Sequence, residues 1–223
     1  MLDVPYLISA GLKIVCFALI GIYLLAQWVK LEKKYTSDIP FLFGVGLLLL
    51  IPGVIIDILF SLSIVGYGLI INIRYALDLV CMLLFLGSLL SVWMASRVKL
   101  RYIVITIMTV VSVTFMMFIP CVDSTSGLDT FHAIISLPSI IIVIITFLFT
   151  YLTKRLTNVH GLLISIAAII VLISQVARPL LKPLAVSEIT PLGLAWVANL
   201  IGIAGWIVLY FGFKYKPSFL EKL

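Results

Sequence analysis

Long apolar segments alternate with short polar segments along the whole chain. Charges, prolines and polar clusters divide the sequence into seven apolar runs, each close to the roughly 20 residues that a helix needs to cross roughly 30 Å of hydrocarbon. No run alternates apolar and polar residues, as a strand of a membrane barrel would. The pattern predicts an all-α integral membrane protein, a bundle of seven transmembrane helices at residues 5–29, 41–62, 70–95, 102–120, 131–152, 162–181 and 192–213.

The composition leads to the same fold class. Of the 223 residues, 64% are hydrophobic and 11% are charged, whereas soluble domains contain about 45–50% apolar and about 25% charged residues. One water-soluble core cannot bury so much apolar surface, so we expect a multi-pass protein of the cell membrane with the lipid bilayer as its main partner. No linker or long polar segment interrupts the runs, which predicts a single domain at 1–223.

The chain has a net charge of +6. The Lys and Arg residues responsible lie mainly in short loops, and their positions indicate how the chain is oriented in the membrane. Cytoplasmic loops are rich in Lys and Arg, and the basic segments here follow every second run. With these segments inside, the N-terminus lies outside and the C-terminus in the cytoplasm. No segment is long enough for a soluble nucleic-acid-binding domain. The basic segments are 30–34, 97–101, 154–155 and 214–222.

The first residues, Met-Leu-Asp-Val-Pro, lack the basic start and the cleavage site of a secretory signal peptide. We therefore expect the first run to be retained as a helix.

Polar residues inside the runs are the candidate functional positions, since an ionisable side chain there costs about 2.5–3.5 kcal/mol on insertion scales. Given the predicted orientation, all of them fall in the outer half of the bilayer. We expect them to form an outward-facing polar pocket that binds a small molecule, or to neutralise one another and fix helix packing. These residues are Lys13, Asp57, Arg74, Asp78, Gln175, Arg178 and Asn199.

Arg74 and Asp78 are four residues apart, a spacing that stacks them on one helix face and allows an ion pair. Asp57, Lys13 and Arg178 could extend that pair into a network across helices. The segment Arg74-Tyr-Ala-Leu-Asp78 resembles the start of the third helix in microbial rhodopsins, with one additional residue before the acid. That resemblance implies a retinal-binding lysine in the seventh helix. The seventh run has no lysine before Lys214, so we do not expect a light-driven pump.

No catalytic motif, cofactor-binding motif or metal-ligand spacing is present in the sequence. Cys16, Cys81 and Cys121 lie in or at the end of apolar runs without a CxxC pattern and are expected to be buried free thiols. We therefore expect no enzymatic activity, no cofactor and no metal.

Three functions remain open. The first is a sensor or receptor-like module that passes ligand binding to a protein partner at the cytoplasmic face. The second is a small secondary transporter in which runs one to three and five to seven form two halves around the fourth. The third is a structural subunit of a larger complex within the membrane.

Overall fold

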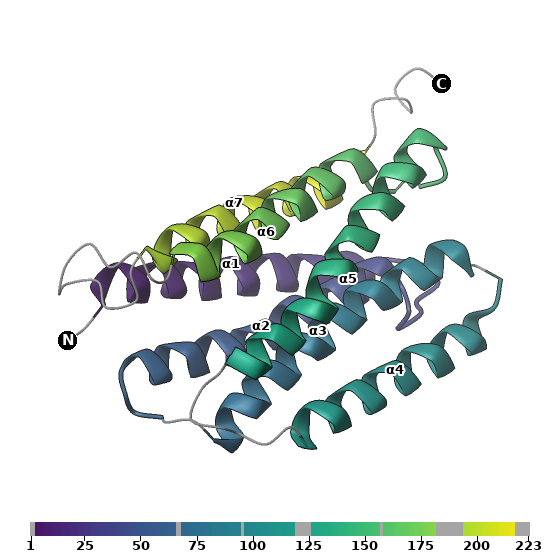
Figure 1. The fold of residues 1–223 in the computed structure, drawn as a ribbon. Helices are drawn as coiled ribbons and strands as arrows, with labels where there is room; N and C mark the ends of the chain where they lie inside the picture. The colour runs from purple at the N-terminus through teal and green to yellow at the C-terminus, as the bar shows by residue number, and fades with distance from the viewer. Residues whose placement is uncertain are drawn as a thin grey trace. The chain divides into compact units, whose positions relative to one another are not determined.

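A computed structural model describes residues 3–65, 68–94, 96–118, 126–156, 158–181 and 194–216. These residues form seven α-helices and no strand, which confirms the predicted helix count and the all-helical fold (Figure 1). The helices are α1 (Val4–Val29), α2 (Ile39–Ser61), α3 (Leu69–Trp93), α4 (Val98–Phe118), α5 (Ser126–Leu152), α6 (Gly161–Leu181) and α7 (Ala195–Lys214).

The largest differences from the predicted boundaries occur at the starts of α4 and α5. α4 begins at Val98 rather than at 102, and α5 begins at Ser126 rather than at 131. At α4 the charges of Lys99 and Arg101 end the apolar run without ending the helix, because Lys and Arg are good helix formers whose long side chains can reach water from within a helix. Residues 95, 119–120 and 192–193 of the predicted spans lie outside the described residues.

Five of the described helices are long and apolar enough to cross a membrane. They are α1, α2, the 72–90 part of α3, the 161–178 part of α6, and α7. The described apolar part of α5, Ser136–Leu152, is shorter. Large apolar side chains point outward on several helices, as with Leu19 at 66% exposure, where lipid would cover them. Length and composition thus support a multi-pass membrane protein.

The described helices fall into two compact units, and each is presented by itself. Unit 1 comprises residues 1–16 and 140–223, and unit 2 comprises residues 17–139. The expectation of a single domain stays a prediction.

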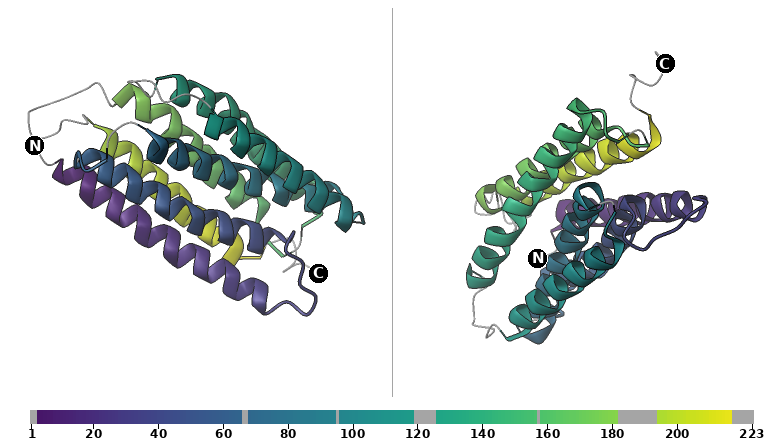
Figure 2. Two further views of the ribbon diagram at one scale, coloured as in Figure 1. Left: turned by 90° about the horizontal axis from the view of Figure 1, so that it is seen from below. Right: turned by 90° about the vertical axis from the view of Figure 1, so that its right-hand side faces the viewer.

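In unit 2, α3 packs against both α2 and α4 (Figure 2). The buried side chains of Tyr75 and Leu79 belong to its core. The second half of α1 lies close to α2, since a Cβ added to Gly21 would be 3.2 Å from the backbone oxygen of Gly44. Glycine on each helix therefore permits a backbone approach that a larger residue would prevent.

In unit 1, α6 and α7 run antiparallel and side by side (Figure 1). The Leu194 amide donates to the Leu181 carbonyl at 3.0 Å, which joins the end of α6 to the start of α7. Gly205 of α7 faces α6 so closely that an added Cβ would lie 3.1 Å from the Ala167 oxygen. The antiparallel packing of α6 and α7 places Arg178, near the end of α6, and Asn199, near the start of α7, at the same end of the unit.

Candidate functional site

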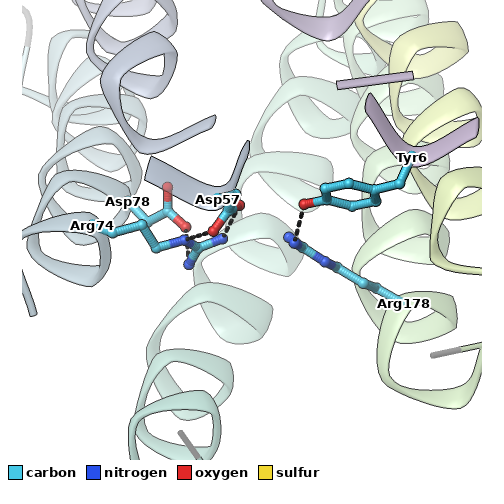
Figure 3. Close-up of polar contacts among 5 residues, drawn as sticks. All are labelled: Tyr6, Asp57, Arg74, Asp78 and Arg178. Carbon is cyan, nitrogen blue, oxygen red and sulfur yellow. Dashed lines mark hydrogen bonds and ion pairs between the residues drawn. The ribbon is translucent and has the colours of Figure 1, made fainter. Parts of the chain in front are cut away.

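The central feature of unit 2 is a cluster of three charged residues on α2 and α3, which we call the charge cluster: Asp57, Arg74 and Asp78. Arg74 donates from Nε to Asp57 Oδ1 at 2.8 Å and from Nη2 to Asp57 Oδ2 at 3.0 Å. Its Nη1 lies 2.8 Å from Asp78 Oδ2. Each of the three guanidinium nitrogens therefore contacts a carboxylate within the protein (Figure 3).

Helix geometry explains how these side chains meet. Arg74 and Asp78 are one turn apart on α3, so they share a face. Asp57 lies in the last two turns of α2, and Gly53 lies one turn before it. A Cβ on Gly53 would be 3.5 Å from Asp78 Oδ1, so glycine leaves the second carboxylate oxygen of Asp78 beside bare backbone of α2.

The cluster is mostly removed from solvent. The side chains of Arg74, Asp57 and Asp78 are 11%, 19% and 14% exposed. In such surroundings an isolated charge is very unfavourable, and Arg74 keeps its charge. The two contacts differ in kind, because Asp57 binds one edge of the guanidinium with two parallel hydrogen bonds whereas Asp78 holds a single nitrogen.

A second set of polar contacts lies in unit 1 and joins α1 to α6 and α7. Arg178 Nη2 donates to the Tyr6 hydroxyl at 3.4 Å (Figure 3). Asn199 Nδ2 donates to Ser9 Oγ at 3.1 Å, and Ser9 Oγ donates to the Tyr6 carbonyl at 2.8 Å. The Tyr6 amide in turn donates to Asp3 Oδ1 at 3.0 Å. Asn199 is 5% exposed, so its hydrogen bond to Ser9 is shielded from solvent.

The structure thus brings together three of the seven candidate residues in the charge cluster. The ion pair expected from the spacing of Arg74 and Asp78 is present, and Asp57 joins it. The other four candidates belong to unit 1, where Lys13 and Gln175 are half-buried on α1 and α6. Ligand binding by any of the seven stays a prediction.

Sequence reasoning missed the hydroxyl partners Tyr6 and Ser9. Such residues attract no attention in an apolar run, because a serine can bond a carbonyl of its own helix at little cost. A usable signal was nevertheless present. Asp3, Tyr6 and Ser9 recur every three residues and therefore share one face at the start of α1.

The described residues contain no group of three or more His, Cys, Asp or Glu side chains that could hold a metal ion. Cys16 and Cys81 are free thiols, and Cys81 Sγ donates to the Gly46 carbonyl at 3.1 Å across α2 and α3. Cys121 lies outside the described residues.

Comparison of the chain with protein-family models, with curated proteins and with solved structures found no match.

Proposed function

We propose that this chain is a multi-pass protein of the cell membrane, with its N-terminus outside and its C-terminus in the cytoplasm, that acts as a non-enzymatic sensor or receptor-like module. The charge cluster on α2 and α3 is its responsive element. A small molecule that competes for the cluster changes the contact between these helices, and a partner at the cytoplasmic face registers the change.

The single observation that carries this proposal is that the two carboxylates bind Arg74 unequally. Asp57 occupies one edge of the guanidinium with two hydrogen bonds, and Asp78 makes one contact with Nη1. The weaker contact is the one that an incoming anionic group can replace, while Asp57 continues to hold the arginine. Replacement breaks the ion pair between Arg74 and Asp78, whose other carboxylate oxygen lies beside Gly53 of α2.

General energetics favour a functional role over packing alone. A buried ion pair is often no more stabilising than well-packed apolar residues, and its best-attested use is in setting register or a switch. Ionisable residues within transmembrane segments commonly mark ligand or ion pathways. The positive-inside rule adds the orientation, because it places the basic segments 30–34 and 97–101 of unit 2 in the cytoplasm and the α2–α3 connection outside.

A thermal-shift screen with small carboxylic acids, amino acids and amines tests the proposal. A ligand of the charge cluster raises the unfolding temperature of the wild-type protein. It loses its effect in Arg74→Lys, which lacks the planar set of donors, and has a larger effect in Asp78→Asn, where the competing carboxylate is gone. Lys33→Gln is the matched control, since Lys33 is exposed and lies in the α1–α2 connection. Compounds that stabilise the wild type and both cluster variants equally, or a panel without any stabilising compound, would contradict it.

The second candidate is a small secondary transporter in which Asp57 or Asp78 carries a proton. The observation in its favour is the sequence Pro52-Gly53 within α2. Pro52 removes a backbone donor five residues before Asp57, and Gly53 leaves an oxygen of Asp78 beside bare backbone. α2 is continuous through this point, but proline and glycine within membrane helices often lie beside the binding sites of transporters. Solute uptake into proteoliposomes that follows an imposed pH gradient, and stops in Asp78→Asn, would support the transporter over the sensor.

A further inference from the structure

A buried arginine of unit 2 lies outside the charge cluster, and one of its side-chain nitrogens has no hydrogen-bond partner among the described residues. Arg101, in the first turn of α4, is 5% exposed, and its Nε atom is enclosed without a hydrogen-bond acceptor in the described part of the chain. Neither Glu32 nor Asp38, the acids of the α1–α2 connection, forms an ion pair with it among the described residues. An enclosed N–H donor without an acceptor, on a cation that has no carboxylate beside it among the described residues, is unfavourable, so this position favours an anion from outside the chain.

A second enclosed polar group belongs to the same end of unit 2. Ser37 is fully buried, and its Oγ has no hydrogen-bond partner among the described residues. The hydroxyl of its neighbour Thr36 donates to the Tyr102 hydroxyl at 2.8 Å, and Tyr102 follows Arg101 in the chain. This bond holds the segment that carries Ser37 against the first turn of α4.

The start of α2 adds backbone donors. Asp38 is the N-cap residue of α2, yet its side chain makes no capping hydrogen bond to the helix. Its Oδ2 instead accepts from the Tyr35 amide at 2.9 Å. Pro40 has no amide, so the donors of the first turn are the amides of Ile39 and Phe41. They receive no side-chain cap from Asp38, and a helix N-terminus of this kind attracts anions.

We infer that Arg101, Ser37 and the start of α2 form a binding site for a phosphate group. Arginine presents a planar set of donors that matches the oxygens of phosphate, serine supplies a hydroxyl, and the helix start supplies amides and a favourable dipole. The surroundings are basic, since residues 30–38 and 96–102 contain six Lys or Arg and two acids. The phosphate can come from a phospholipid headgroup at the membrane surface or from a free phosphate in solution.

Ser37 Oγ and Arg101 Nε are enclosed, so an anion reaches them only when the 30–38 segment opens locally. The segment is otherwise well held, since Trp28 Nε1 donates to the Tyr35 carbonyl at 3.1 Å and the rings of Trp28 and Phe41 are 4.7 Å apart. A bound phosphate would then keep the segment closed by joining α2 to α4. The inference does not depend on the orientation of the chain or on the charge cluster.

Arg101→Gln and Lys99→Gln provide a matched pair of variants, because both remove one positive charge from the first turn of α4 and Lys99 is exposed. The proteins are compared in a maltoside detergent, which contains no phosphate, at constant ionic strength. The two probes are inorganic phosphate and phosphatidylglycerol. The readouts are the unfolding temperature and the hydrogen exchange of the 30–38 segment.

Without a probe, Arg101→Gln is expected to unfold at the same temperature as the wild type or at a higher one, because it removes an uncompensated charge. With a probe, the wild type and Lys99→Gln gain stability and protection of the segment. Arg101→Gln binds at least about tenfold more weakly, as loss of a charge-assisted hydrogen bond predicts.

A response to both probes identifies a site for free phosphate, and a response to phosphatidylglycerol alone identifies a lipid headgroup site. An equal response of Arg101→Gln and the wild type, or no response of the wild type to either probe, would overturn the inference.

Discussion

At the scale of single residues, Arg74 determines what its neighbours can do. Arginine stays charged in proteins, so a buried Arg74 requires carboxylates around it, and Asp57 and Asp78 supply them from two helices. Removal of one partner from a buried ion pair costs about 3–5 kcal/mol, because the remaining charge is left without compensation. The cluster is therefore both a clamp between α2 and α3 and a point at which small chemical changes have large effects.

Asp57→Asn is expected to destabilise the protein more than Asp78→Asn. Asp57 accepts two hydrogen bonds from Arg74 and Asp78 makes one contact. Each variant leaves the other carboxylate beside Arg74, so the loss follows the contacts removed. We expect about 3–6 kcal/mol for Asp57→Asn and about 1.5–3 kcal/mol for Asp78→Asn. Unfolding of the purified variants in detergent measures the difference, and a larger loss for Asp78→Asn would show that the two contacts are ranked wrongly.

The sequence predicts some of the contacts of these charged residues and not others. Arg74 and Asp78 could be paired from their positions four residues apart, because helix geometry decides that contact. Asp57 was placed on the adjoining helix, but its two-point contact with Arg74 depends on the register of α2 against α3. The burial of Arg101, with no acceptor for its Nε among the described residues, could not be predicted either, since an arginine near the end of an apolar run is expected to reach water.

At the scale of helices, small residues decide how closely the backbones approach. Run length alone predicted the seven helices, because a membrane span demands about 20 apolar residues. It did not predict which glycines lie at contacts. Gly205 meets the backbone of α6, whereas a Cβ on Gly11 would have no atom within 4 Å, and the two look alike in the sequence.

Gly205→Ala is expected to loosen the contact between α6 and α7. The added Cβ would lie 3.1 Å from the Ala167 oxygen and 3.2 Å from the Val171 nitrogen, and backbone atoms cannot move aside as a side chain can. We expect a loss of about 1–3 kcal/mol in the free energy of unfolding. Gly11→Ala is the control and should cause no loss, since alanine is the better helix former. Equal effects of the two substitutions would contradict a close backbone contact between α6 and α7 at Gly205.

The hydrogen bond between Asn199 and Ser9 should contribute measurably to the packing of α7 on α1. Hydrogen bonds between membrane helices contribute about 0.6 kcal/mol on average and up to about 1.7 kcal/mol. A double-mutant cycle of Asn199→Ala and Ser9→Ala is expected to give a coupling energy in this range. A coupling of zero would indicate that the 3.1 Å contact does not stabilise the fold.

At the scale of the whole molecule, the account depends on how the chain crosses the membrane. Length and composition support several membrane spans, and the distribution of Lys and Arg predicts their direction. If the direction is as proposed, the α2–α3 connection faces outward, and the charge cluster near the end of α2 lies in the outer half of the bilayer. A sensor of extracellular molecules requires that placement.

Labelling of single cysteines with a membrane-impermeant maleimide tests the placement most directly. In a background without the three native cysteines, Ile64→Cys reports on the α2–α3 connection, where Ile64 is 66% exposed. Lys33→Cys and Lys154→Cys report on two of the basic connections. The account predicts that Ile64→Cys reacts in intact cells and that the other two react only after the membrane is opened. Reaction of Lys33→Cys and Lys154→Cys in intact cells, with Ile64→Cys protected, would contradict it.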